Sequence, residues 1–586
     1  MGAITVLDER LCNRIAAGEV VERPAAAIKE LIENALDAGA TRVIVELRDG
    51  GLEAIRVTDN GGGIAAGELD LAVARHATSK IRTVADLDAI ATLGFRGEAL
   101  PSIAAVSRFT LASRPAGAAA GAWLRLEGGT PAGGGVSGMA PGTTVEADNL
   151  FFNAPARRKF LKAAPTELRY VLEIVNHLSL SRPEVEFLVR NGGHEALHYP
   201  ACAAVADRLL QVFGRDFSRN MFTAEAAQED HRLRAYGAKP ALARGNSRGI
   251  VSFINGRFFR GREVMSAVRE GYRRYLPAGK WPFAVLFLEV PLDRVDVNVH
   301  PQKTEVRFRE PGRIHALIRN AFSRALSDTP VAVAYPAGGV EPPWAGRRGP
   351  AAPAAVHEPS AALFEFPPPA AGREGAPRSD FGPASAAPPV RPAATPAGRA
   401  FQVYDAYIVE ETPAGIMVHD QHALHEGLME IRLRRAFAAQ KFAVQELLIP
   451  EQIDLPPADR AQLLELAGVL RECGFEIQPF SGNTVVFHAV PAVFDTARLG
   501  AFVADILAIE DAATADADAH RAVIQRIINR TACHSSIRAG QRLKPEEISE
   551  LLAAARAEPE SGSCAHGRPA SFLIPKADIE RRFQRK

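Results

Sequence analysis

The sequence predicts a multidomain α+β protein, and three observations carry this prediction. Residues 24–38 begin with a proline and place apolar side chains at helical spacing, which predicts a helix. Two strand-like runs follow at 41–47 and 54–58, and the sequence RDGG between them predicts an antiparallel hairpin. An alanine- and proline-rich segment then divides the chain. Antiparallel strands beside helices favour α+β layers over a doubly wound parallel sheet.

Length and composition limit the possible classes of protein. A chain of 586 residues with 47% hydrophobic residues is long enough for several folded domains. The 69 basic and 68 acidic residues give a formal charge of +1, so any nucleic-acid contact must come from a local patch. Five cysteines are too few for a disulfide scaffold and fit a reducing compartment. We find no signal peptide and no long apolar run, so we expect a cytoplasmic protein.

The dividing segment, residues 331–400, contains 20 alanines and 15 prolines, and we expect it to be a disordered linker. Before it, strand patterns near 249–257, 283–290 and 295–299 and a helix near 312–327 predict a second domain at 205–330. The first domain then covers residues 1–204. After the linker, 401–586 opens with strands and continues with a helix from about Ala423. Alternating patterns predict an inserted regulatory subdomain near 457–525.

Polar residues on the first helix and after the second strand indicate a nucleotide site. No GxxxxGK[ST] motif is present, which excludes a Walker-type site. Glu30 and Asn34 are four residues apart and share one helix face, where a carboxylate and an amide can act as general base and metal ligand. Asp59 follows a strand and precedes Gly61 and Gly63, so it can accept a hydrogen bond from an adenine amino group. The alternatives are a solvated helix face and a glycine-rich turn.

Four motifs in this order resemble those of the GHKL ATPases: ENALDAG, DNGGGI, GFRGEAL and GTTV. That superfamily includes gyrase-type topoisomerases, heat-shock chaperone ATPases, sensor histidine kinases and MutL proteins. IAAGEVVERPAAAIKELIENALDAGAT, LAVARHATSK and GFRGEALPSIAAVS resemble the MutL mismatch-repair proteins in particular, and this likeness covers most of residues 1–330. The resemblance implies a Bergerat-type α/β sandwich ATPase domain, an α/β transducer domain, and ATP and magnesium as ligands.

The resemblance also implies roles for matched residues. Glu30 would be the general base for ATP hydrolysis, Asn34 would bind magnesium, and Asp59 would recognise adenine with support from Thr143. Lys303 would reach the terminal phosphate from the transducer domain and stabilise the developing charge. The remaining matched residues would form the phosphate cradle and the lid over ATP: Gly61, Gly63, Gly94, Phe95, Arg96, Gly97, Thr78, Ser79 and Lys80. ATP would then favour a closed state in which two N-terminal bodies pair.

The C-terminal part carries donors that suit zinc or another first-row transition metal. They lie in DQHALHE (Asp420, Gln421, His422, His425 and Glu426), in TACHSSIRAG (Cys533) and in SCAHGRP (Cys564 and His566). The alternative is two buried cysteines and unrelated surface histidines. These three stretches resemble the endonuclease motifs of MutL proteins that nick DNA, which implies that Asp420, His422, Glu426, Cys533, Cys564 and His566 bind zinc or manganese, with Asp420 catalytic. Two departures stand out, because Ile431 replaces the family's second glutamate and Ala565 replaces a proline.

Two further segments indicate macromolecular partners. QELLIP resembles a peptide that binds the replication sliding clamp, with Gln445 in a polar pocket and Leu448 and Pro450 in an apolar one; the alternative is an ordinary strand or loop. Residues 257–280 carry seven Lys and Arg residues, which predicts sequence-independent binding to the DNA backbone. Arg269, Arg273 and Arg274 are its first candidates, a second basic cluster lies at 157–159, and the alternative is a solvated basic helix.

Together with these features, the resemblance implies a homodimeric mismatch-repair ATPase. Its closure on ATP would link mismatch recognition by MutS to downstream strand processing, and its C-terminal domain would dimerise and nick DNA with a metal. The alternative is a noncatalytic ATP-dependent matchmaker whose C-terminal domain only dimerises and recruits partners. Two other classes of GHKL protein are disfavoured. A sensor kinase would need a phosphoacceptor helix before Glu30, and we expect none in the short stretch there. A topoisomerase would need a tyrosine cleavage domain, for which 331–400 leaves no room.

Overall fold

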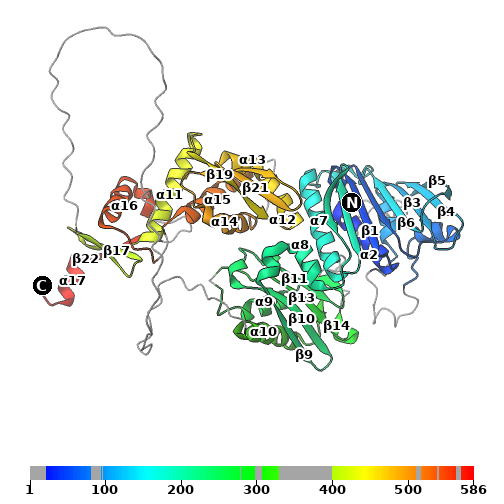
Figure 1. The fold of residues 1–586 in the computed structure, drawn as a ribbon, viewed down its shortest axis with the longest axis horizontal. Helices are drawn as coiled ribbons and strands as arrows, with labels where there is room; N and C mark the ends of the chain where they lie inside the picture. The colour runs from blue at the N-terminus through cyan, green and yellow to red at the C-terminus, as the bar shows by residue number, and fades with distance from the viewer. Residues whose placement is uncertain are drawn as a thin grey trace, which may run out of the picture. The chain divides into compact units, whose positions relative to one another are not determined.

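A computed structural model describes residues 21–80, 94, 97–276, 279–296, 306–328, 399–509, 517–537, 540–562 and 569–585 (Figure 1). The predicted linker up to residue 398, together with Phe95, Arg96, Lys303, Cys564 and His566, lies outside the described residues. The chain forms two compact units. The first contains the described residues before 329 together with 426–536, and the second contains 399–425 with the described residues after 536. Within the described part, no helix is long and apolar enough to cross a bilayer.

The N-terminal part of the first unit contains an eight-stranded sheet, with its strands in the order β5-β4-β3-β6-β2-β1-β7-β8. The predicted hairpin is confirmed, because β1 pairs antiparallel with β2. β1 also pairs with β7 in parallel, so the sheet is mixed, and the prediction of α+β layers is confirmed. The strand bounds are β1 Arg42–Arg48, β2 Ala54–Asp59, β3 Arg108–Arg114, β4 Gly121–Glu127, β5 Thr130–Ser137, β6 Gly142–Asp148, β7 Glu186–Asn191 and β8 His194–Tyr199.

Helices α2 (Pro24–Asp37) and α7 (Ala164–Ser181) contact each other and cover one face of this sheet (Figure 1). The predicted helix at 24–38 is thus confirmed. Ile28 and Ile32 of α2 are fully buried with Val43 and Ile55 of the sheet in one hydrophobic core. Complete burial of such side chains stabilises by about 1.5–3 kcal/mol each. Shorter helices of this part are α3 Leu69–Ala72, α5 Ala99–Ala105 and α6 Pro155–Arg158.

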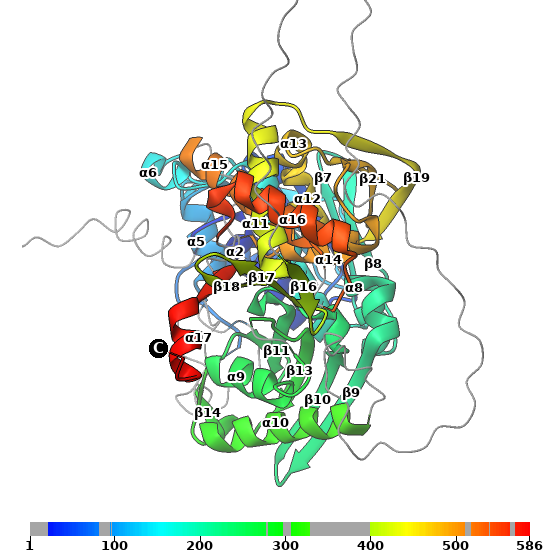
Figure 2. The same cartoon turned by 90° about the vertical axis from the view of Figure 1, so that its left-hand side faces the viewer.

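A five-stranded sheet follows, in the order β12-β11-β13-β10-β9. The strands predicted near 249–257 and 283–290 are present, and the helix predicted at 312–327 is confirmed as α10. Helices α9 and α10 lie side by side along this sheet (Figure 2). The bounds are α8 Val205–Asn220, β9 Met221–Gln228, β10 His231–Ala238, β11 Ile250–Ile254, β12 Arg257–Phe259, α9 Arg262–Gly271, β13 Ala284–Glu289, β14 Val295–Asp296, β15 Arg307–Phe308 and α10 Pro311–Asp328.

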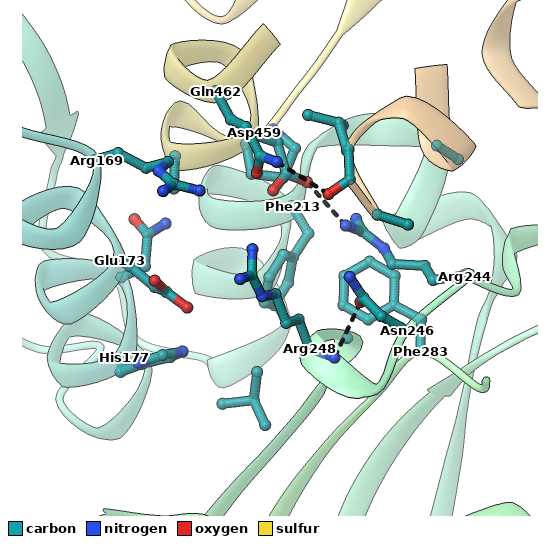
Figure 3. A pocket seen from close by; sticks show the side chains of 18 residues that line it. Arg169, Glu173, His177, Phe213, Arg244, Asn246, Arg248, Phe283, Asp459 and Gln462 are labelled. Carbon is teal, nitrogen blue, oxygen red and sulfur yellow. Dashed lines mark hydrogen bonds and ion pairs between the residues drawn. The ribbon is translucent and has the colours of Figure 1, made fainter. Parts of the chain in front are cut away.

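Polar and aromatic contacts join α7, which covers the first sheet, to the edge of the second sheet at β12. His177 of α7 stacks on Phe258 of β12 with ring centroids 4.0 Å apart, and Glu173, one turn earlier, forms an ion pair with Arg260 at 3.3 Å. Figure 3 shows Glu173 and His177 on the same side of α7. Arg208 of α8 is completely buried and donates to the carbonyl oxygens of Pro183, Val185 and Pro200. Three backbone acceptors around one guanidinium fix α8 against the segments that precede β7 and follow β8.

The C-terminal part contains two smaller sheets. In the second unit, four strands run in the order β16-β17-β18-β22, and α16 lies beside β16 (Figure 2). In the first unit, three strands run in the order β19-β21-β20. The bounds are β16 Ala400–Val403, β17 Tyr407–Thr412, β18 Gly415–Asp420, α11 Gln421–Ala438, β19 Val444–Asp454, α12 Pro457–Glu465, α13 Ala467–Glu472, β20 Glu476–Pro479, β21 Thr484–Pro491, α14 Leu499–Ile506, α15 Ala517–Ser535, α16 Pro545–Ala557, β22 Ser571–Pro575 and α17 Lys576–Arg582.

The turn between β16 and β17 holds two residues in the left-handed backbone region. Tyr404 has φ +55° and Asp405 has φ +48°, and the Tyr404 side chain is 87% exposed. The Asp405 carbonyl oxygen accepts hydrogen bonds from Gln421 Nε2 at 3.0 Å and from the Gly540 N–H at 2.8 Å. These bonds impose the turn on a bulky residue that disfavours it.

Replacement of Tyr404 by Asn is therefore expected to stabilise the hairpin, because Asn adopts positive φ at lower cost. The free energy of local opening of β16 and β17, measured by hydrogen exchange, should rise by about 1 kcal/mol. Tyr407→Asn, in the regular part of β17, is the control and should lower this free energy. An equal loss of this opening free energy in both variants would contradict backbone strain at Tyr404.

Candidate functional site

The polar face of α2 lines a cleft of about 760 Å³. Burial of Ile28 and Ile32 on the opposite face turns Glu30 and Asn34 towards this space. The Lys29 ammonium lies 3.4 Å from Glu30 Oε1 and 3.1 Å from Glu33 Oε1. The residues predicted for nucleotide binding that line the same cleft are Glu30, Asn34, Asp59, Gly63, Thr78, Ser79, Lys80, Gly94, Gly97 and Thr143.

Asp59 ends β2 at the floor of the cleft, directly opposite Thr143 of β6. Its Oδ1 accepts a hydrogen bond from the Gly61 N–H at 2.8 Å, and the Thr143 backbone N–H also donates to it. Burial raises the pKa of Asp59 above its usual value, while these two backbone donors oppose the rise. A half-buried carboxylate on a rigid strand end is a strong acceptor for an amino group.

Ser113 of β3 supports this floor, and no motif in the sequence pointed to it. Its hydroxyl donates to the Gly142 carbonyl oxygen at 3.0 Å, and it accepts from the Ile64 N–H at 2.8 Å. The Thr143 hydroxyl lies 2.9 Å from the Ser113 hydroxyl and therefore donates to it. Ser113 thus fixes the side chain of Thr143 beside Asp59.

Two glycines allow the backbone to close around the cleft. Gly63 has φ +72°, and a Cβ atom there would lie 2.4 Å from the Arg114 carbonyl oxygen. Gly97 has φ +62°, and its Cβ would lie 2.5 Å from the carbonyl oxygen of Ala77, next to Thr78. Any side chain at either position would push the walls apart.

Lys80 reaches into the cleft between two polar groups of α2. Its Nζ donates to Asn34 Oδ1 at 2.9 Å and to Asp37 Oδ2 at 2.6 Å. The sequence motifs did not single out Asp37, although it lies three residues after Asn34 on the same helix face. Of the other predicted residues, Gly61 adjoins the cleft in the chain without lining it, and Phe95, Arg96 and Lys303 are outside the described residues.

The predicted metal ligands of the C-terminal part that the structure describes lie at the start of α11 and near the end of α15. Asp420 caps α11, since its Oδ1 accepts hydrogen bonds at 3.0 Å from the backbone N–H groups of His422 and Ala423. His422 Nδ1 lies 2.7 Å from the Ile537 carbonyl oxygen, and His425 Nδ1 accepts from the Ile537 N–H at 3.2 Å. Both imidazoles are therefore oriented by the backbone that follows α15.

Glu426 and Cys533 interact with each other. Burial, followed by the charge of Glu426, raises the pKa of the Cys533 thiol to about 11. Ile431, the departure from the family motif, is buried with 4% exposure, and Glu430 accepts a hydrogen bond from Gln525 at 3.2 Å. Among the described side chains, no group of three His, Cys, Asp or Glu residues is arranged to hold a metal. Cys564 and His566 fall outside that description.

QELLIP lies in β19, where the pairing with β21 is interrupted between Glu446 and Glu451. Gln445 remains paired with Val490, whereas Leu448 is 99% exposed and Ile449 is 79% exposed. The segment is therefore a strand, as the alternative expects, and a bulge in that strand turns apolar side chains outwards. Clamp binding stays a prediction.

The basic segment 257–280 divides into exposed cations and buried aromatics. Arg269, Arg273 and Arg274 are exposed, and the Arg269 guanidinium lies 4.6 Å from the ring centroid of Trp281. Tyr272 is completely buried, and its hydroxyl donates to the Ala238 carbonyl oxygen at 2.9 Å. The aromatic residues at 259 and 272 thus belong to the core, and the three arginines face outwards.

Comparison with protein families matches three stretches of the chain. Residues 22–127 match a "Histidine kinase-, DNA gyrase B-, and HSP90-like ATPase" family. Residues 209–327 match "DNA mismatch repair protein, C-terminal domain", and 400–543 match "MutL C terminal dimerisation domain".

Individual relatives match along the whole chain. The DNA mismatch repair protein MutL of Rhizobium rhizogenes is 39% identical over 99% of this chain and 100% of its own length. The MutL protein of Anaeromyxobacter dehalogenans is 40% identical over the full length of both chains. Among solved structures, the MutL ATPase domain of Aquifex aeolicus complexed with ADP is 30% identical, with a TM-score of 0.35, over 51% of this chain and 98% of that one. The chain belongs to the MutL family of DNA mismatch repair proteins, with a GHKL-type ATPase domain and a C-terminal dimerisation domain.

Proposed function

We propose that ATP hydrolysis occurs in the cleft of the eight-stranded sheet and drives the repair cycle. The observation that carries the proposal is that Glu30, Asn34, Asp59 and Thr143, drawn from separate elements, line one cleft. The cleft is large enough for a nucleotide. Its donor set also fits magnesium, because Asn34 supplies a carboxamide oxygen and the glycine backbones leave room for phosphates.

The residues then divide the reaction among them. The Asp59 carboxylate accepts from the adenine amino group and fixes the base, while Glu30 accepts a proton from the attacking water. Asn34 would hold magnesium, which neutralises phosphate charge when it is bound. Thr78, Ser79 and Lys80 would border the phosphates, and Lys303 would supply a second cation from the transducer domain.

Glu30→Ala should reduce the turnover of ATP by at least about 100-fold, because the general base is removed. Binding of a fluorescent ATP analogue should change little. Asp59→Asn is the matched variant, and it should weaken binding by about 10- to 100-fold because it exchanges a charged acceptor for an amide. Phosphate release that continues undiminished in Glu30→Ala would refute the mechanism.

We propose, second, that the C-terminal part nicks DNA with zinc or manganese. The support is the donor chemistry, in which the His422 imidazole is oriented by the Ile537 carbonyl oxygen and the thiol of Cys533 lies beside the Glu426 carboxylate. Asp420, His422, Glu426, Cys533, Cys564 and His566 would bind the metal, which activates water when it is bound. The buried Ile431 removes one acidic position, so the ligand set would be smaller than in the family motif.

Asp420→Asn should lower nicking of supercoiled plasmid with manganese by more than about 100-fold. Cys533→Ser should lower the metal content of the purified full chain, whereas Cys202→Ser, which alters a half-buried cysteine elsewhere, should not. Nicking that is the same in wild type and Asp420→Asn would favour the alternative function, a noncatalytic matchmaker.

We propose, third, that Arg269, Arg273 and Arg274 bind the phosphates of DNA without sequence preference. The exposed guanidinium groups lie on α9 and just after it, and the neighbouring aromatics are turned inwards, which favours backbone contact over base stacking.

Replacing Arg273 and Arg274 by Glu should weaken DNA binding most at low salt. The slope of log affinity against log salt should fall by about 0.9 for each phosphate that the variant no longer neutralises. Arg190→Glu is the control, because Arg190 faces Glu46 at 3.8 Å. An unchanged slope in the double variant would reject this surface.

The family includes a dimerisation domain, and we propose that the open face of the β16-β17-β18-β22 sheet forms the homodimer. Phe401, Val409, Val418 and Phe572 stand opposite one another across its four strands. Phe401 is 56% exposed and Phe572 is 60% exposed, as expected of an apolar surface that a second copy covers. Phe572→Asp should sediment as a monomer, whereas Phe480→Asp, at another exposed site, should remain dimeric.

The remaining partners are a sliding clamp and MutS. Exposure of Leu448 on a bulge supports clamp binding through Gln445, Leu448 and Pro450. Undiminished binding of purified clamp by Leu448→Ala would reject it. The link to MutS rests on family membership. Its test is co-purification of the chain with MutS on mismatched DNA, and absence of co-purification would reject the link. ATP-dependent pairing of the N-terminal bodies should appear as added association in sedimentation with a nonhydrolysable analogue.

A further inference from the structure

Asp37 stands at an electrostatically unfavourable position in α2. It is the last residue of the helix, where the helix dipole disfavours a negative charge, and its side chain is only 9% exposed. The helix end is already satisfied through the backbone, since the N–H groups of Ala38 and Ala40 donate to the Asn34 and Ala35 carbonyl oxygens. A buried carboxylate at this place therefore needs a reason other than helix stability.

The contacts of Asp37 provide that reason. Its Oδ2 accepts from Lys80 Nζ at 2.6 Å and from the Gly94 backbone N–H at 3.1 Å. One carboxylate oxygen thus joins two separate stretches of chain to the end of α2. Gly94 also lies close to the groups on α2, since a Cβ atom there would be 3.3 Å from Lys80 Nζ and 3.5 Å from Asn34 Oδ1.

The same ammonium also donates to Asn34 Oδ1, at 2.9 Å. Asn34 Oδ1 is the oxygen that we assign to magnesium. Two cations that share one oxygen repel each other strongly in a half-buried cleft. Full occupation of the oxygen by one cation therefore weakens the binding of the other. Lys80 and magnesium therefore compete for Asn34, and the ion pair with Asp37 determines how strongly Lys80 competes.

We propose that Asp37 is a positioning residue of the ATP site: it holds the Lys80 ammonium at Asn34 and thereby sets the magnesium concentration that nucleotide binding requires. The inference rests on the proposed ATPase function. It gives Asp37 a role that acts through Lys80 rather than through contact with the nucleotide.

The test uses the full chain and a fluorescent nonhydrolysable ATP analogue, titrated with magnesium at fixed nucleotide concentration. Lys80→Met removes the competing charge and should lower the magnesium midpoint at least about fivefold. Asp37→Asn should lower it in the same direction, because the ammonium is no longer held. Asp37→Asn combined with Lys80→Met should add nothing to Lys80→Met, and Asp70→Asn, an exposed carboxylate on α3, should leave the midpoint unchanged.

The outcomes separate the two claims. A magnesium midpoint that is unchanged or raised in Lys80→Met, or strictly additive shifts in the double variant, would overturn the role of Asp37. Lys80→Met removes the ammonium and leaves Asp37 in place, so it decides the question even where Asp37→Asn does not fold. Failure of the unmodified chain to bind the analogue at any magnesium concentration would instead overturn the proposed ATPase function.

Discussion

The burial of one face of α2 against the eight-stranded sheet determines the geometry of the proposed ATP site. Ile28 and Ile32 are wholly excluded from water, which fixes the rotation of the helix about its axis. With that rotation set, Glu30, Asn34 and Asp37 must point to the other side, where β2 and β6 meet the cleft. The chemistry of the cleft is thus a consequence of apolar packing on the far side of the helix, and a cavity in this core would misplace the polar groups without touching them.

Much of this arrangement could be predicted from local sequence. The spacing of apolar residues in 24–38 and the RDGG turn predicted α2 and the β1–β2 hairpin, because both depend on contacts between near neighbours. The polar residues Glu30, Asn34 and Asp59 followed from their places on those elements. Their meeting in one cleft depended on the family resemblance, since no local pattern brings β6 beside β2.

Residues whose role comes from distant partners were missed. Ser113 is an ordinary strand serine until β3 pairs with β6 and places its hydroxyl beside Thr143. Asp37 gains its role only when Lys80 and Gly94 approach it. In the basic segment, charge could be read from sequence, but the division between exposed arginines and buried Tyr272 required the packing of α9 on its sheet.

The outer strand of the large sheet has a consequence for the behaviour of the protein in solution. In β5, every residue from Thr130 to Val136 is exposed, and the strand forms one edge of the described sheet. Such an edge can recruit strands from other molecules and lead to aggregation. Pro131 and the three glycines at 133–135 are poor strand formers, so they make this edge a weak template. This edge is therefore a poor site for the addition of strands from other molecules.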